Sequence, residues 1–154
     1  MACEVADICQ YSLRPAGEAE ADIIKQLVRN ARLNPLGLDW RRFTVAVDPA
    51  GQIIGCIQTK PHRQAQELAS LVVRREWRGE GVARRLVEHI MDEAGRPVWL
   101  MCASPLVPFY ERFDFETVEE PGEMPPYFRR IHRLFTLFRF FSRGEVRLAV
   151  MVWR

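Results

Sequence analysis

The stretch from Leu68 to Leu86 constrains the fold most strongly, because an apolar run passes through a basic turn with two glycines straight into a helical pattern. The apolar run ends at Val73 and predicts a strand, since a short run rich in β-branched residues and followed by turn residues seldom has another structure. From Gly81 onward apolar residues recur at every fourth position and predict a helix, with Gly95 well placed just after its C-terminus. The sequence therefore predicts a strand, a glycine turn and a helix in succession.

The turn RGEGVA is suited to binding an anion. It consists of Arg78, Gly79, Glu80, Gly81, Val82 and Ala83. Its two glycines allow consecutive backbone N–H groups to converge on one point without a Cβ in the way. The N-terminus of the helix adds a partial positive charge and unpaired N–H donors, and Arg84 adds a full charge. Two glycines alone would favour a simple connection, so the spacing of the motif decides between the two interpretations.

Two familiar phosphate-binding patterns do not fit this turn. Val82 and Ala83 occupy the positions at which a Walker loop needs Lys and Ser or Thr, and Arg84 stands where the dinucleotide fingerprint needs a third small residue. The pattern Arg/Gln-x-x-Gly-x-Gly/Ala does fit, because Arg78, Gly81 and Ala83 satisfy it and a strand ends about five residues earlier. The turn thus resembles the pyrophosphate loop of the GNAT superfamily of N-acetyltransferases.

A second stretch resembles the other signature of that superfamily, in which a strand is followed by a short helix with Phe-Tyr and then by a turn with Gly-Phe. The counterparts here are Val98 to Cys102, Phe109 with Tyr110, and Asp114 with Phe115. Asp114 replaces the usual glycine, and because Asp tolerates the left-handed conformation better than most residues, we expect the turn to be kept. Ala103 and Ser104 stand where the family often places Asn, and we expect Ser104 to contact the cofactor. The two signatures cover roughly residues 66 to 118.

The remaining elements agree with a single N-acetyltransferase domain over residues 1–154. We expect strands at 8–13, 43–47, 53–58, 66–73, 98–102 and 146–153, and helices from about 18 to 34, after the glycine turn, and over 127–141. The apolar stripe of the first helix is expected to be Ile23, Ile24, Leu27, Val28 and Ala31. This order predicts an α/β (α+β) fold that is GNAT-like. Its mixed, mostly antiparallel central sheet of about six to seven strands has helices on both faces.

The resemblance implies acetyl-CoA as the co-substrate and transfer of its acetyl group to a primary amine by direct attack in a ternary complex. It also implies that backbone N–H groups of Leu71, Val72 and Val73 contact the thioester and pantetheine, while the glycine turn and Arg84 hold the pyrophosphate. No metal is implied. A non-catalytic CoA-binding or interaction module with the same fold is the alternative.

Two side chains are candidates for the proton transfers that acetylation requires. An amine with a pKa of about 10.4 is mostly protonated at neutral pH and must lose a proton before it attacks. Glu67 lies eleven positions before Arg78, a spacing similar to that of the catalytic glutamate of the superfamily's histone acetyltransferases; otherwise it is an ordinary residue at the start of a strand. Tyr110 resembles the family's general acid, and its alternative role is core packing. The histidines are interpreted as incidental, namely His62, His89 and His132.

The C-terminal region combines a basic face with an apolar face. In the expected helix the apolar face comprises Tyr127, Ile131, Leu134, Phe138 and Phe141, and the basic face comprises Arg129, His132, Arg133, Arg139 and Arg143. A packed helix with a solvated basic face is favoured, while contact of residues 127–143 with an anionic surface, an acidic substrate or a partner stays open. In the GNAT family this segment often lines the acceptor pocket.

Composition excludes several classes of protein. With 48% hydrophobic and 27% charged residues and a net charge of +2, the chain is typical of a soluble globular domain, and it carries no nucleic-acid-binding motif. No apolar run reaches 18 residues, and the N-terminal segment lacks the basic start of a signal peptide. The four cysteines are scattered and match neither a disulfide framework nor a zinc site. We therefore expect a cytoplasmic protein whose partner is an amine; a homodimer stays open.

Overall fold

The computed structural model describes residues 10–138 and 146–154, and the chain divides into two compact units. The first unit comprises residues 1–58 and 70–87, and the second comprises residues 59–69 and 88–154. In the described residues the strands follow the hydrogen-bonded order β1-β2-β3-β4-β5-β7-β6. Strand β4 pairs with β5 in parallel, whereas β1 with β2, β2 with β3, β5 with β7 and β6 with β7 are antiparallel. The predicted mixed, mostly antiparallel sheet is confirmed.

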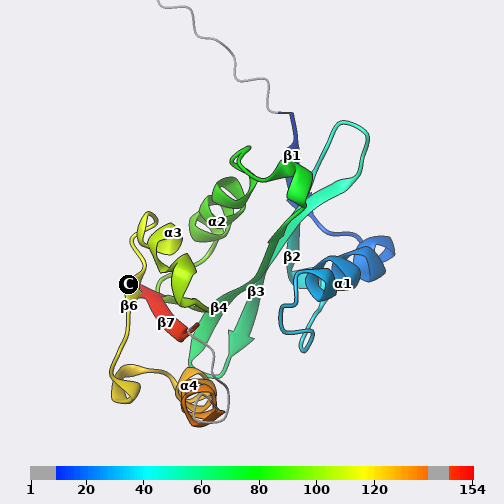
Figure 1. The fold of residues 1–154 in the computed structure, drawn as a ribbon. Coiled ribbons are helices and arrows are strands. Elements are labelled where there is room, and N and C mark those ends of the chain that lie inside the picture. The colour runs from blue at the N-terminus through cyan, green and yellow to red at the C-terminus, as the bar shows by residue number, and fades with distance from the viewer. Residues whose placement is uncertain (1–9, 139–145) are drawn as a thin grey trace, which may run out of the picture. The chain divides into compact units, whose positions relative to one another are not determined.

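Figure 1 labels the elements. The strands are β1 (Ser12–Pro15), β2 (Phe43–Val47), β3 (Ile53–His62), β4 (Ala65–Val73), β5 (Val98–Ala103), β6 (Glu116–Thr117) and β7 (Leu148–Trp153). The α-helices are α1 (Ala21–Asn30), α2 (Val82–Glu93), α3 (Val107–Glu111) and α4 (Pro126–Phe138). The first strand was expected at 8–13, but pairing with β2 continues to Pro15 opposite Thr44. Proline is tolerated there because β1 is an edge strand; positions 8 and 9 lie outside the described residues.

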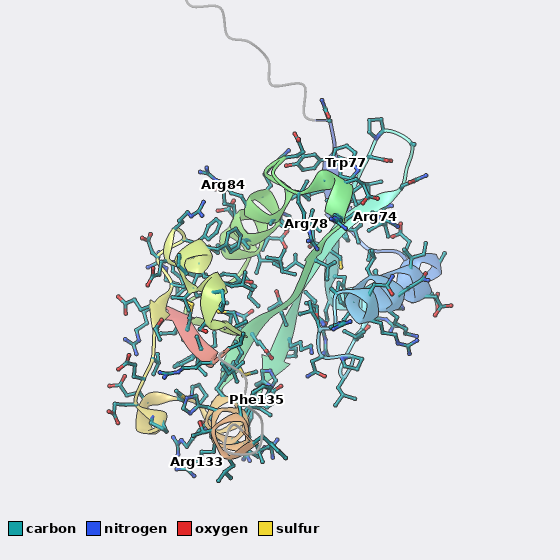
Figure 2. The ribbon with its side chains drawn as sticks, in the orientation of Figure 1. Arg74, Trp77, Arg78, Arg84, Arg133 and Phe135 are labelled. Carbon is teal, nitrogen blue, oxygen red and sulfur yellow. The ribbon has the colours of Figure 1, made fainter. Side chains whose placement is uncertain are left out.

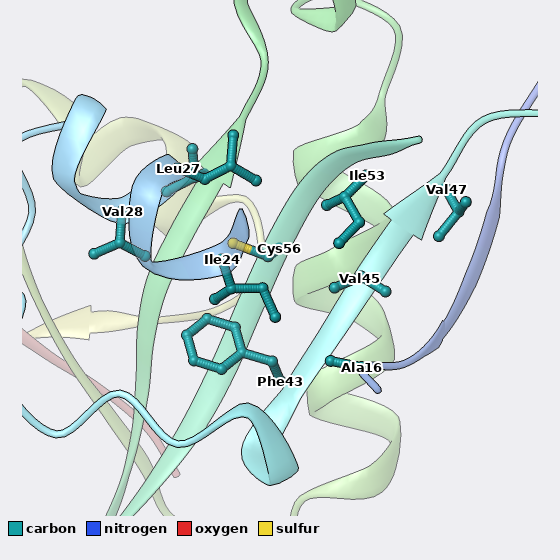
Figure 3. Packing of buried hydrophobic residues seen from close by; sticks show 10 residues of the cluster. Ala16, Ile24, Leu27, Val28, Phe43, Val45, Val47, Ile53 and Cys56 are labelled. Carbon is teal, nitrogen blue, oxygen red and sulfur yellow. The ribbon is translucent and has the colours of Figure 1, made fainter. Parts of the chain in front are cut away.

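Helix α1 covers one face of the strands in the first unit. Figure 3 shows Ile24 and Val28 of the helix with Phe43 of β2 and Cys56 of β3 in one buried cluster. Each fully buried side chain of this kind contributes roughly 1.5–3 kcal/mol. Ile23 was expected in the same stripe but is 43% exposed, since successive helical residues point about 100° apart and the neighbouring Ile24 takes the buried direction.

Helix α2 begins on the opposite face of the same strands. Successive strand residues point to opposite faces, so Gly55 faces away from the cluster that contains Cys56. A Cβ at Gly55 would lie 2.9 Å from the carbonyl oxygen of Val72, and 3.2 and 3.3 Å from the side chains of Val82 and Leu86. Glycine is therefore required for the close approach of α2. The predicted placement of helices on both faces is confirmed for this unit.

Helix α4 supplies the core of the second unit. Phe128 is fully buried and packs with Trp99 of β5 and Val150 and Val152 of β7. Its ring centroid lies 5.5 Å from that of Trp99. Strands β5 and β7 carry this cluster on a ladder that runs from Val98 opposite Trp153 to Ala103 opposite Leu148. The first turn of α4 is thereby packed against the sheet.

The predicted buried face of the C-terminal helix was right only near its start, where Tyr127 packs against the core. Leu134 and Phe138 were expected in the core but are 43% and 66% exposed, while Phe128, which was not on the predicted face, is fully buried. The contact of Phe128 with β5 and β7 fixes the rotation of α4, and from Arg133 to Phe138 every side chain is exposed within the described part of the chain. Residues 139–141 and 143 of the prediction lie outside the described residues.

Candidate functional site

The glycine turn adopts the backbone conformation that its sequence predicts. Strand β4 ends at Val73, a short 3-10 turn spans Arg75–Trp77, and α2 begins at Val82. Gly79 and Gly81 have φ angles of 87° and 76°, a region that only glycine adopts readily. A Cβ at Gly79 would meet nothing within 4 Å, and one at Gly81 would lie 3.9 Å from the Tyr11 hydroxyl. Glycine is thus needed for the conformation and leaves open space in front of the turn.

The first backbone N–H groups of α2 lie at the end of the glycine turn. The N–H of Arg85 donates to the carbonyl of Gly81 at 3.1 Å and begins the helical bonds, so the preceding N–H groups have no partner within the helix. These groups form the positive end of the helix dipole. Figure 2 shows Arg74 and Arg78 after β4 and Arg84 on α2 in the same unit. This is the arrangement that binds phosphate.

Two arginines near the turn also support it structurally. Arg74 Nε donates to the carbonyl of Ile53 at 2.6 Å, and Arg78 Nε donates to that of Val73 at 3.4 Å. Tyr11 packs edge-on against Trp77 at 6.3 Å, and the guanidinium of Arg85 lies 5.3 Å from the Tyr11 ring centroid. Sequence analysis missed Tyr11, because no local pattern shows that a residue about 70 positions before the turn packs next to it.

Strand β4 is irregular just before the backbone groups that were expected to hold the thioester. Ser70 has a φ of 56°, which interrupts regular strand geometry. The Ser70 hydroxyl accepts a hydrogen bond from Gln58 Nε2 at 2.8 Å, and the Ser70 carbonyl lies 3.8 Å from Cys56 Sγ. Strand β4 pairs with β5 at Gln66 and Glu67 and then continues to Val73.

Tyr110 lies in the second unit, on the short helix α3. It is 7% exposed, with the rings of Phe109 and Phe115 at 5.0 and 6.1 Å. Burial, and after it the charge of the Cys102 thiolate, raises the pKa of the Tyr110 phenol; burial raises the pKa of Cys102 itself to about 11. The phenol is therefore protonated at neutral pH. Asp114 has a φ of 63°, so the predicted left-handed turn is confirmed.

Ser104 lies next to a cavity in the same unit. Its N–H donates to the carbonyl of Arg147 at 2.8 Å, and its Oγ accepts from the Arg147 N–H at 3.2 Å. The cavity measures about 690 Å³, and its lining includes Ser104, Val107, His132 and Phe135. Figure 2 labels Phe135 on α4. Helix α4 therefore contributes His132 and Phe135 to a pocket within this unit.

Glu67 is also in the second unit, and its carboxylate has a partner that sequence analysis dismissed. Glu67 is 6% exposed, and its Oε2 lies 2.6 Å from Nε2 of His62. The predicted strand ended at residue 58, which left His62 in a turn; β3 instead continues to His62, opposite the start of β4. Had the strand been predicted to continue to His62, the short turn before β4 would have indicated that His62 and Glu67 can meet across the hairpin.

Among the described residues, no three His, Cys, Asp or Glu side chains come together as a metal site. None of the helices within 10–138 and 146–154 has the length and apolar character needed to cross a membrane.

Comparison with known proteins decides the family. The family model for the acetyltransferase (GNAT) domain matches residues 39–117, just over half of the chain. The chain belongs to the GNAT acetyltransferase family. No curated protein matches this GNAT chain in the sequence search.

Solved structures agree with the fold of this GNAT protein. N-acetylglutamate synthase from Neisseria gonorrhoeae, complexed with coenzyme A and L-arginine, has a TM-score of 0.73 and 20% identity over 94% of this chain and 33% of its own. This GNAT chain therefore spans about a third of that synthase. A GCN5-related N-acetyltransferase from Kribbella flavida has a TM-score of 0.66 and 20% identity, covering 94% and 97% of the two chains. Arabidopsis thaliana Naa50, in complex with a bisubstrate analogue, has a TM-score of 0.63 and 15% identity, covering 94% and 99%.

Proposed function

We propose that this GNAT protein is an acetyl-CoA-dependent N-acetyltransferase that acetylates a primary amine by direct attack in a ternary complex. The observation that carries the proposal is the glycine turn: left-handed Gly79 and Gly81, open space before them, and the N-terminus of α2 directly after them. Membership of the GNAT family and the coenzyme A complex of the Neisseria synthase support it.

The proposed cofactor contacts use backbone groups for the most part. The N–H groups of Gly79 to Ala83 would hold the pyrophosphate, with Arg78 and Arg84 adding positive charge around it. The N–H groups of Leu71 to Val73 would contact the pantetheine and the thioester oxygen, where β4 continues beyond the residues that pair with β5. Ser104 is the proposed polar contact after β5. Acetyl-CoA supplies an activated acyl group, and no metal is needed for this chemistry.

Two side chains would move the protons. Glu67 would accept a proton from the substrate ammonium, so that the nitrogen lone pair can attack the thioester carbon. The carbon–sulfur bond then breaks, and the leaving thiolate takes a proton from the phenol of Tyr110. The second surplus proton of the attacking nitrogen is released, and the phenolate regains a proton through water. A phenol is protonated at neutral pH, as the donor must be at the start. Burial raises the pKa of Tyr110 and makes its phenol a weaker acid in the absence of substrate.

The acceptor is proposed at the level of chemical class. The structural relatives include proteins complexed with L-arginine and with a bisubstrate analogue of a peptide, so amino acids, other small amines and peptide amines are all candidates. We place the protein in a reducing cytoplasm, where buried thiols such as Cys56 and Cys102 stay reduced. A homodimer and contact of α4 with an anionic surface are not needed for the proposed activity.

The direct test is to incubate the protein with acetyl-CoA and a library of amines, amino acids and peptides and to measure free thiol. Thiol release that depends on the acceptor, with acetylation of that acceptor detected by mass spectrometry, is the expected result. Binding of CoA by calorimetry without release for any acceptor would instead favour a non-catalytic CoA-binding module. Failure to bind CoA would refute both proposals.

A further inference from the structure

The His62–Glu67 pair is the best-defined group of polar side chains in the second unit. The Glu67 side chain is 7% exposed and that of His62 is 18% exposed, and their nearest atoms are 2.6 Å apart. A buried carboxylate without a hydrogen bond is costly, so this contact is required for Glu67 to stay buried. His62 and Glu67 come from the two strands of one hairpin, which fixes their separation.

Helix α4 holds the imidazole from another direction. The ring of Tyr127 stacks on His62 with centroids 3.8 Å apart and an interplanar angle of 18°. Phe128 meets the same imidazole edge-on at 5.7 Å, and its own burial anchors α4 to β5 and β7. Burial, and after it the negative charge of Glu67, raises the pKa of the Tyr127 phenol. The imidazole thus has little freedom to turn away from Glu67.

The contact has one direction when Glu67 is ionised. An ionised carboxylate oxygen only accepts hydrogen bonds, so Nε2 of His62 is then the donor. The Oε2 atom of Glu67 is then engaged by Nε2, and Oε1 takes no part in this contact. The orientation of the carboxylate is set by the imidazole, as it is when one group orients the base in other catalytic sites.

We infer that His62 is the positioning residue for Glu67, holding Oε2 through Nε2–H so that Oε1 faces the proton of the substrate amine; this rests on the proposed function. In the step, the substrate N–H bond breaks and an Oε1–H bond forms, which neutralises Glu67. The nitrogen–carbon bond forms, the carbon–sulfur bond breaks, and the thiolate takes its proton from Tyr110. The second surplus proton of the attacking nitrogen is released, and the Tyr110 phenolate regains a proton through water. His62 keeps its Nε2 proton throughout, and Glu67 afterwards returns its proton to water.

The first test needs neither cofactor nor acceptor. Nitrogen-15 NMR of the folded wild-type protein should show the Nε2–H tautomer of His62, with a strongly deshielded Nε2 proton that is lost or shifted in Glu67→Ala. Detection of the Nδ1–H tautomer with an unprotonated Nε2 would overturn the inference, whatever the activity of the protein.

The second test separates the hydrogen bond from the stacking. His62→Phe keeps a ring against Tyr127 but removes the donor, and we expect about a tenfold or greater loss in kcat. His62→Gln keeps an N–H donor near the position of Nε2 and should retain kcat within about threefold. KM for the amine should change less than kcat in both variants, because the substrate contact is made by Glu67.

Matched controls decide between positioning and general destabilisation. His89 also lies near a glutamate, with Nε2 3.5 Å from Glu93 on α2, and His89→Phe should leave kcat unchanged. In a Glu67→Gln background, His62→Phe should cause no further loss of kcat. Equal kcat in His62→Phe and wild type, or equal losses in His62→Phe and His62→Gln, would refute the inference. If wild type itself transfers no acetyl group, the proposed function fails, and the NMR result still decides the geometry of the pair.

Discussion

Replacing Gly81 by Val tests the glycine turn and its predicted ligand. At a φ of 76° a residue with a Cβ costs roughly 1–2 kcal/mol. The nearest atom to the added Cβ is 3.9 Å away, so no steric clash adds to this value. The free energy of unfolding, measured with urea, should therefore fall by about 1–2 kcal/mol. The valine side chain would also occupy the space before the N–H donors, and losing one or two charge-assisted hydrogen bonds should weaken CoA binding by about 3 kcal/mol, or roughly a hundredfold in Kd.

Gly51 provides a control for the backbone strain. It lies in the turn between β2 and β3 of the same unit, with a φ of 82° and nothing within 4 Å of an added Cβ. Gly51→Val should therefore destabilise the protein by a similar amount without changing the Kd for CoA measured by calorimetry. Wild-type affinity in Gly81→Val, or an equal loss of affinity in Gly51→Val, would refute the assignment of the turn.

Three further predictions concern catalysis and folding. Tyr110→Phe should lower kcat by about 10² to 10⁴ with little change in CoA affinity, and normal turnover would mean that another group protonates the thiolate. Glu67→Gln should show a defect in kcat/KM that shrinks as the pH rises toward the pKa of the amine, about 10.4, where free amine becomes abundant; a defect that is constant with pH would make Glu67 positional. Phe128→Ala should lower the free energy of unfolding by about 3–5 kcal/mol, whereas Leu134→Ala, at an exposed position, should change it by less than about 0.5 kcal/mol; equal losses on denaturant unfolding would contradict the observed face of α4.

The features that the sequence predicted correctly depend on neighbouring residues. The hairpin between β2 and β3 follows from Asp48, whose Oδ1 accepts hydrogen bonds from the N–H groups of Ala50 and Gln52. The left-handed conformations of Gly81 and Asp114 likewise follow from residue type and motif spacing. The order of strands and helices was predictable because each element has its own periodicity.

The tertiary structure decided what depends on contacts between distant segments. Periodicity gives α4 an apolar side but cannot select its rotation, which the packing of Phe128 against β5 and β7 determines. The pairing of His62 with Glu67 required the true length of β3 and the position of Tyr127 above the imidazole. The sequence by itself therefore determined the GNAT-like motifs and local turns. Only the tertiary structure determined which side chains meet, because burial and hydrogen bonding across strands and helices depend on the whole packed arrangement.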